Sequence, residues 1–264
     1  MKHLLYAIML IGLFACQKEN RGEEQQPPAP EPAPVPAVCK VNTIREYPAV
    51  DGNSILRTFT YDDKNRVTKL HLQYDNNVAV TKNISYNAEG KIDNISYSSG
   101  ASETFAYTNG VLTGWEAFEA AGNPAKKTTF TYNGGKLVRE DRFVYNTTAG
   151  TYQANEYVVF EWNGNGNITA IKTFGANDVL KASDTYAYDA QKLNKQQTIT
   201  PQMDLMFMNW SNDITAFINS KHLLNNVISK KRKLVYETND SGFITAIKSD
   251  RNDNFFTFAY ACSN

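Results

Sequence analysis

The chain has 264 residues, and its 27 basic and 27 acidic side chains give a formal net charge of zero. That balance leaves no basic footprint and excludes nucleic acid as the expected partner. Aromatic residues make up 12% of the chain, mostly as Tyr and Phe, so it can build a sizeable core.

Residues 1–15 have the form of a secretory signal. Leu4 to Phe14 is an apolar run too short to cross a bilayer, which takes about 20 residues. The end of this run, Leu13-Phe14-Ala15-Cys16, resembles the lipobox of bacterial lipoproteins, in which the cysteine is acylated, with palmitate for example. We therefore expect a lipoprotein signal peptide, lipidation of Cys16 and a lipid anchor in the outer membrane. The alternative is an ordinary cleaved signal that leaves Cys16 without a role.

Residues 16–38 are predicted to be a tether. Gln17 to Glu24 is polar and partly acidic, and it resembles the export tag that sends Bacteroidota lipoproteins to the cell surface. A plain solvated linker is the alternative, so a periplasmic and an outward-facing location both stay open. Pro27 to Pro36 holds six of the nine prolines, which favours an extended, semi-rigid spacer. Such a spacer holds a domain away from the membrane.

Residues 39–264 form the predicted domain, and a turn motif recurs along them. Most copies are 21 to 30 residues apart, which is typical of a repeat architecture. Asn-Gly and Asx-x-x-Gly sequences favour tight turns, so each copy predicts a β-hairpin. With two strands per copy, the sequence predicts an all-β fold: a curved or closed antiparallel sheet of about 14 strands. The copies begin at Tyr61, Tyr86, Tyr107, Tyr132, Trp162, Tyr188 and Asn239.

The strands that enter these turns alternate between large apolar and small polar residues. Period-two alternation indicates that one face is buried and the other meets water. The polar face does not suit a lipid-embedded barrel, whose outward band is apolar. The predicted buried row is Phe59, Ile84, Phe105, Phe130, Phe160 and Tyr186, and the polar face includes Thr60, Asn83, Ser85, Thr129 and Thr131.

One segment, residues 201–227, departs from this pattern. Its apolar residues recur at three- and four-residue steps between Met203 and Ile218, which is helical spacing. Thr200 suits a helix cap and Pro201 a first helical position. We expect a short helical insertion that packs over or inside the sheet. A partner-binding groove lined by Met side chains is the alternative.

The lipobox, the proline tether, the tyrosine-headed hairpins and the C-terminal stretch together resemble a Bacteroidota lipoprotein domain family. That family has no known function and has a porin-like fold. The hairpins are also similar to the tyrosine-aspartate repeats of Rhs and wall-associated proteins. The resemblance implies a curved or closed antiparallel sheet and supplies no catalytic residues. Its C-terminal part covers Asn219 to Leu224, Val235 to Ile247 and Phe256 to Cys262.

The sequence contains no recognisable catalytic, cofactor-binding or metal-binding motif. His71 and His222 stand alone, without Cys or paired carboxylates at ligand spacing. Asp250 to Asn254 alternates oxygen ligands as a calcium loop does, but it lacks the required glycine and the final acid. We interpret it as a polar turn, with calcium as the weaker alternative.

Two function classes remain open. The first and favoured one is a non-catalytic envelope lipoprotein that binds a glycan or protein partner or serves structurally, with exposed Trp115 and Trp162 as a candidate ligand platform. The alternative is a hydrolase for extracellular glycan or peptide, which would need two carboxylates to converge. Acids that folding could bring together are Glu116, Glu119, Glu140 and Asp141.

Cys39 and Cys262 stand at the two ends of the predicted sheet. If the sheet closes, its first and last strands meet and the two cysteines become neighbours. Export to an oxidising compartment would then allow a disulfide between them. Two free, buried thiols are the alternative.

Overall fold

The computed structural model describes residues 38–47, 54–193, 220, 222–227, 230, 232–240, 243–249 and 254–263. These residues all belong to one compact unit, residues 37–264. The signal segment, Cys16, the tether and residues 194–219 lie outside the described residues. The predictions made for them, including the helix between Met203 and Ile218, stay predictions.

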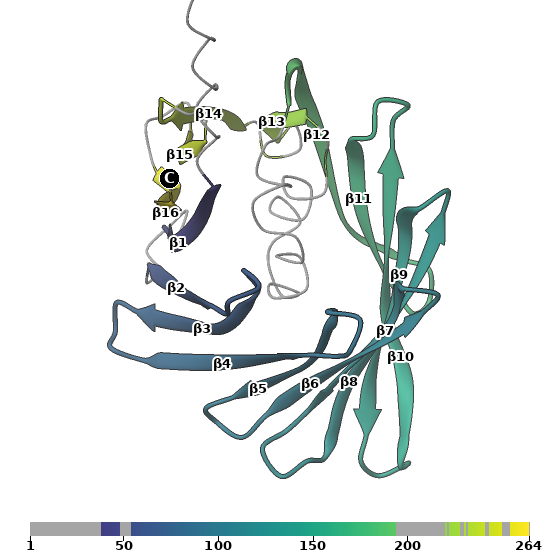
Figure 1. Ribbon diagram of the computed structural model, residues 1–264. Helices are drawn as coiled ribbons and strands as arrows, with labels where there is room; N and C mark the ends of the chain where they lie inside the picture. The colour runs from purple at the N-terminus through teal and green to yellow at the C-terminus, as the bar shows by residue number, and fades with distance from the viewer. Residues whose placement is uncertain are drawn as a thin grey trace, which may run out of the picture. The chain divides into compact units, whose positions relative to one another are not determined.

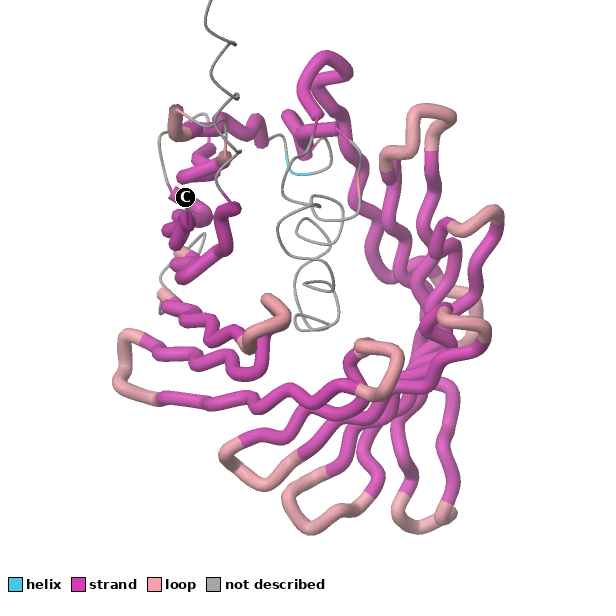
Figure 2. Tube along the Cα trace, viewed as in Figure 1, coloured by secondary structure: helices cyan, strands magenta, loops and turns pink. Residues whose placement is uncertain are grey.

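The described chain is almost entirely strand and tight turn (Figures 1 and 2). It has no helix with the length and hydropathy of a membrane span. The strands are β1 (Val38–Glu46), β2 (Ile55–Tyr61), β3 (Val67–Tyr74), β4 (Ala79–Tyr86), β5 (Ile92–Tyr97), β6 (Ser102–Thr108), β7 (Val111–Phe118), β8 (Pro124–Asn133), β9 (Lys136–Asn146), β10 (Thr151–Trp162), β11 (Ile168–Gly175), β12 (Leu180–Leu193), β13 (His222–Val227), β14 (Arg232–Thr238), β15 (Ile244–Ser249) and β16 (Asn254–Ser263).

Each strand pairs antiparallel with its neighbours in chain order, and the two end strands pair with each other. β1 pairs with β2 on one side and with β16 on the other, so the hydrogen-bonded sheet closes into a barrel. This confirms the predicted all-β antiparallel fold. Six of the seven predicted turns join consecutive strands between β2 and β15, whereas the copy at Tyr188 lies inside β12, which runs on to Leu193. β1 and β16 add the two strands that form the closing seam.

The predicted helical insertion was placed too far toward the C-terminus. Residues 222–227 form strand β13, which pairs with both β12 and β14. Its Leu224 and Val227 are fully buried in the core. Pairing with two neighbouring strands and burial of these side chains outweigh the local helical spacing, which belongs to residues before 219.

The turn motif is explained by a side-chain cap. In four turns, an Asp or Asn oxygen accepts the backbone N–H four residues further on, while its own N–H donates to the carbonyl of that residue. The pairs are Asp62–Arg66, Asn87–Lys91, Asn163–Asn167 and Asn239–Phe243, with side-chain bonds of 2.8, 2.9, 3.1 and 2.9 Å. The residue at the fourth turn position takes a positive φ, 62° at Asn65 and 75° at Gly90, which Asn and Gly adopt most easily.

In seven of the even-numbered strands, an aromatic residue donates a hydrogen bond to a carbonyl in the preceding odd-numbered strand. We call this contact the aromatic latch. Because turn and carbonyl lie at the same strand ends, the latches line one rim of the sheet. The pairs are Tyr61–Val41 (2.7 Å), Tyr86–Val67 (2.7 Å), Tyr107–Ile92 (3.0 Å), Trp162–Leu137 (2.7 Å), Tyr188–Ile168 (2.7 Å), Tyr260–Ile244 (2.6 Å) and Tyr236–Leu224.

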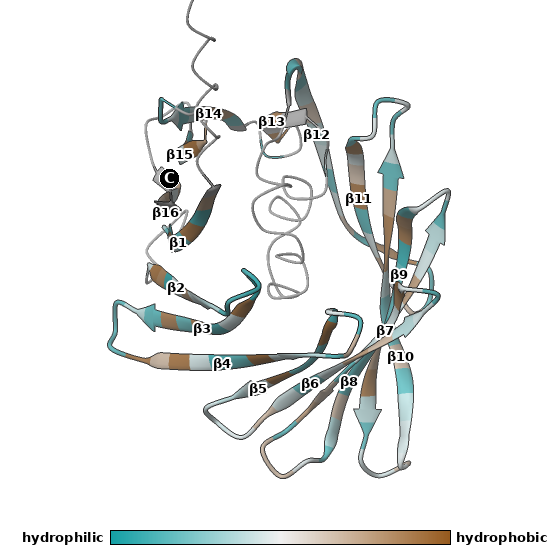
Figure 3. Cartoon of the chain, in the orientation of Figure 1, coloured by the Kyte–Doolittle hydropathy of each residue, from teal (hydrophilic) through white to brown (hydrophobic). Residues whose placement is uncertain are grey.

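One face of the sheet, here called the inner face, carries the buried apolar row. Phe59, Ile84, Phe105, Phe160 and Tyr186 are buried as predicted, while Phe130 is half-buried. The opposite, outer face carries exposed polar residues, Thr60, Asn83, Ser85 and Thr131 among them. Figure 3 shows the resulting alternation of apolar and polar positions along the strands. The predicted period-two pattern is therefore confirmed.

Candidate functional site on the inner face of β9 to β12

The inner face changes from apolar to charged along β9 and β10. Glu140 lies directly opposite Phe130 and Val158, so it shares the inner face with the apolar row. Two positions further along β9, Arg142 lies opposite Glu156. Because side chains alternate along a strand, these three charged side chains occupy the inner-face positions that continue the buried apolar row.

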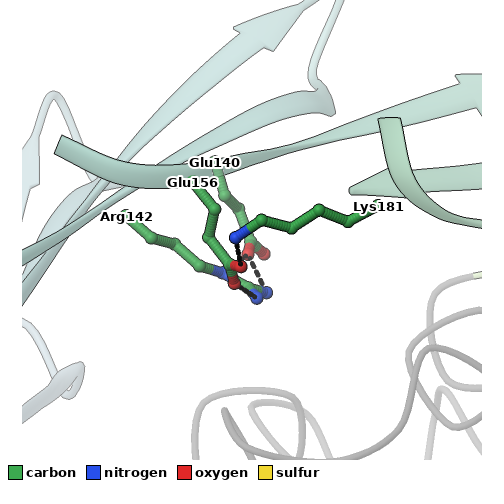
Figure 4. A network of polar contacts seen from close by, with 4 residues as sticks. All are labelled: Glu140, Arg142, Glu156 and Lys181. Atoms are coloured by element: carbon green, nitrogen blue, oxygen red, sulfur yellow. Dashed lines mark hydrogen bonds and ion pairs between the residues drawn. The ribbon is translucent and has the colours of Figure 1, made fainter. Parts of the chain in front are cut away.

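These side chains bond to one another and to Lys181, which comes from β12 (Figure 4). The Arg142 guanidinium donates to Glu140 Oε2 at 2.8 Å and to Glu156 Oε1 at 3.1 Å. Lys181 Nζ donates to Glu156 Oε2 at 3.2 Å. We call Glu140, Arg142, Glu156 and Lys181 the inner charged cluster.

Gly175 makes room for the lysine of this cluster. It lies directly opposite Glu156 in the β10–β11 pair. A Cβ atom at this position would lie 3.2 Å from Lys181 Cε and 2.8 Å from Asn177 Oδ1. The absence of a side chain therefore lets Lys181 cross the end of β11 and reach Glu156.

Contacts within the cluster stabilise the charged forms of Glu156 and Arg142. Burial alone would raise the pKa of Glu156, but hydrogen bonds from Arg142 and Lys181 lower it below its usual value. Burial opposes the charge of Arg142, yet the two glutamates raise its pKa. The side chains of Arg142 and Lys181 are 37% and 48% exposed, and that of Glu140 is 15% exposed. The accessible groups of the cluster are thus mostly hydrogen-bond donors.

A second set of buried polar groups lies on the inner face of β2 to β7. The Arg57 side chain, 3% exposed, forms an ion pair with Glu46 at 2.6 Å. Lys82 lies over the ring of Tyr97, 4.9 Å from its centroid, and Tyr97 donates to Glu103. Burial lowers the pKa values of Arg57 and Lys82. Arg57 and Glu103 are buried and Lys82 is half-buried, whereas the basic side chains of the inner charged cluster, Arg142 and Lys181, are 37% and 48% exposed.

The structure contradicts the predicted tryptophan platform. Trp115 is 6% exposed, and its indole N–H donates to Glu103 at 3.0 Å. Trp162 is half-buried in an aromatic latch, with Lys136 over its ring at 5.5 Å. Both aromatic side chains pack and donate hydrogen bonds inside the sheet, so neither presents an open ring to a ligand.

The four acids proposed from the sequence are not gathered in one site. Glu116 pairs with Lys127 at 2.8 Å and Asp141 with Arg139 at 2.6 Å, on the outer face. Glu140 points to the inner face, because neighbouring residues of a strand alternate. Glu119 lies in the turn after β7. The sequence analysis missed Arg142, Glu156 and Lys181, although Glu140 and Arg142 already occupy inner-face positions in the strand alternation.

Among the described residues, no group of three or more His, Cys, Asp or Glu side chains is placed to hold a metal ion. His71 is half-buried and contacts Thr81, with 3.0 Å between Nδ1 and Oγ1. The side chain of His222 and residues 250–253 of the suggested calcium loop lie outside the described part. Cys39 is buried and lies directly opposite Cys262 in the β1–β16 pair.

No protein-family model matches this sequence, and no curated protein matches it significantly. Solved structures do match its fold. A porin-like protein from Bacteroides uniformis is 14% identical, with a TM-score of 0.57 over 87% of this chain and 98% of the other. A porin-like protein from Bacteroides vulgatus is 15% identical, with a TM-score of 0.53 over 84% and 98%. The chain therefore shares the antiparallel sheet fold of these porin-like proteins.

Proposed function

We propose that this protein is a non-catalytic, lipid-anchored protein of the bacterial cell envelope whose β domain binds a glycan at the inner charged cluster. The lipobox-like sequence before Cys16 and the proline-rich tether support the anchor. The porin-like Bacteroides proteins of similar fold are consistent with an envelope location.

The observation that carries the glycan assignment is the fixed, exposed donor pair of the cluster. Arg142 and Lys181 are held by Glu140 and Glu156, so their remaining N–H groups are already oriented. Sugar hydroxyls both donate and accept hydrogen bonds, and the cluster offers both partners side by side. Charge-assisted bonds are the stronger ones, and pre-oriented groups lose less entropy on binding.

The same geometry favours binding over hydrolysis. A glycoside hydrolase needs one protonated carboxylic acid with a raised pKa. Glu156 has a lowered pKa, as do Asp62 and Asp75, each bonded to basic or hydroxyl groups. Glu140 is bonded to Arg142. The three carboxylates with lowered pKa values, Glu156 among them, are poor proton donors at neutral pH.

Binding can be tested on a glycan array with the purified full-length protein. We expect a signal for envelope or host glycans that falls at least about tenfold in Arg142→Gln and Lys181→Gln, since each loses a charge-assisted bond. Lys172→Gln is the matched control, because Lys172 pairs with Glu161 on the outer face. An unchanged signal in the cluster variants, or no signal from the parent, would contradict the glycan assignment.

The anchor can be tested separately by detergent partitioning and palmitate labelling. Each buried methylene contributes about 0.8 kcal/mol, so two or more acyl chains hold a protein at the membrane. We expect Cys16→Ser to lose the label and move to the aqueous phase. If Cys16→Ser partitions as the parent protein does, the lipoprotein assignment is wrong.

A further inference from the structure

The outer face of β9 to β11 carries aromatic side chains where the rest of the sheet carries small polar ones. The β8–β9 and β9–β10 registers place Phe143 opposite Lys127 and Ala154, and Tyr145 opposite Tyr152. Tyr157 lies opposite Phe174 in the β10–β11 pair. We call Phe143, Tyr145, Tyr152, Tyr157 and Phe174 the outer aromatic strip. All five are half-buried, so each keeps some exposed surface.

The strip is pre-ordered by contacts within itself. The Tyr157 and Phe174 rings stack with 4.9 Å between centroids and 12° between planes, and the Arg139 guanidinium lies 3.8 Å from the Tyr157 centroid. Tyr157 also donates to Asp178 at 2.9 Å. Tyr145 and Tyr152 meet edge to face at 5.3 Å. Side chains fixed in this way lose little conformational freedom when a partner covers them.

Here the sheet reverses its usual polarity. Behind most of the outer aromatic strip, the inner positions hold the inner charged cluster and the exposed residues Val144 and Gln153, and only Val158, next to Tyr157, belongs to the apolar core. The aromatic rings therefore cannot be explained as the buried side of these strands. Tyr, Phe and Arg are the residue types enriched in the cores of protein interfaces, which points to a protein partner for this face.

We propose that the outer aromatic strip is the interface between two copies of this chain. The charged groups beside the strip carry both signs: Lys127 pairs with Glu116, Arg139 pairs with Asp141, and Asp178 accepts the bond from Tyr157. A patch that carries both signs in nearly equal number can face its own copy across a two-fold axis with little net repulsion. A partner whose surface carried mainly one sign of charge would not require acidic and basic side chains in similar numbers on this face.

The interface is expected to be small. A stable dimer buries about 800 Å² on each partner, more than five half-buried aromatic side chains offer. The association is therefore weak in dilute solution and becomes significant where copies are held close together. A shared membrane raises the local concentration of tethered proteins in this way.

Cysteine cross-linking on purified full-length protein tests the interface with a matched pair of positions. Ala154 lies on the outer face, directly opposite Phe143, and its exposed neighbour Gln153 lies on the inner face, opposite Val144. We expect Ala154→Cys to give a disulfide-linked dimer on a non-reducing gel, with several-fold less dimer from Gln153→Cys. Equal cross-linking of both, or of neither, would overturn the proposal.

A second pair of substitutions, made in the Ala154→Cys protein, checks that the strip itself holds the two copies together. Phe143→Arg should reduce the dimer at least fivefold, because it places a charge in the interface. Val144→Arg should leave it unchanged, since Val144 is 43% exposed on the opposite face of the same strand. Circular dichroism checks that both proteins keep their strands. A dimer that survives Phe143→Arg would contradict the assignment.

Discussion

Tyr61 and Asp62 show what the recurring dipeptide does at the level of single residues. The tyrosine hydroxyl donates to the Val41 carbonyl in the neighbouring strand, and the aspartate oxygen caps the turn through the N–H of Arg66. Arg66 in turn lies over the ring of Tyr86, 4.4 Å from its centroid, at the next latch. This turn is thus tied both to the strand before it and to the next latch.

The buried row predicts a sharp contrast between neighbouring residues. Phe59→Ala should lower the free energy of unfolding by about 3–5 kcal/mol, as loss of a large core side chain does. Thr60→Ala, on the exposed outer face, should change it by less than about 0.5 kcal/mol. Urea denaturation measures both, and similar losses would contradict the assignment of the two faces.

The aromatic latch predicts a loss of stability at high pH. Burial raises the pKa of Tyr61 and of Tyr86 to about 12, from 10 in the unfolded chain. The unfolded chain therefore releases these protons first, so the contribution is complete below pH 10 and is lost as pH rises toward 12. Urea midpoints at pH 8 and pH 11 should differ less in a Tyr61→Phe, Tyr86→Phe double variant than in the parent. An equal difference in both proteins would show that the latch hydroxyls do not titrate in this way.

At the level of elements, the turns were the most predictable feature. Asx and Gly residues have specific backbone roles, so their spacing located six of the seven turns correctly, and only the copy at Tyr188 falls inside a strand, β12. Strand β13 was misassigned because a short segment such as residues 222–227 carries little periodicity of its own. Its place in the sheet depends on pairing with β12, from which residues 194–221 separate it, as well as with the next strand, β14.

One turn offers a direct test of the side-chain cap. Asn87→Ala removes the oxygen that accepts the Lys91 N–H at 2.9 Å. We expect a loss of about 0.5–1.5 kcal/mol in the free energy of unfolding, the usual contribution of one hydrogen bond. Asn76→Ala is the control, because its bond to Val78 is a more exposed one of 3.2 Å. A larger loss at Asn76 than at Asn87 would argue against the proposed role of the cap.

The candidate site was less predictable than the fold. Glu140 was singled out from the sequence, but its partners are Arg142 on the same strand and Glu156 and Lys181 on two others. Their meeting depends on the register of β9, β10 and β12 and on the missing side chain of Gly175. The prediction of Trp115 as an exposed ligand platform was wrong, because a large aromatic side chain suits a buried core position as well as a ligand-binding surface.

In the whole molecule, the two ends of the sheet meet and close it. Every other neighbouring pair of strands is joined through the chain, whereas β1 and β16 are far apart in sequence and meet only by pairing. Val41 accepts the latch bond of Tyr61 and lies opposite Tyr260 across the seam. The seam therefore follows the same latch pattern as the other strand pairs.

A search for the Cys39–Cys262 disulfide, which we propose across this seam, tests the closure of the sheet. Directly opposite residues in an antiparallel pair have Cα atoms about 4.5–5.5 Å apart, within the range that a disulfide spans. Mass spectrometry of a non-reduced digest should find one linked peptide pair containing both cysteines. Two alkylated, unlinked cysteines in the exported protein would contradict the proposed covalent closure of the sheet.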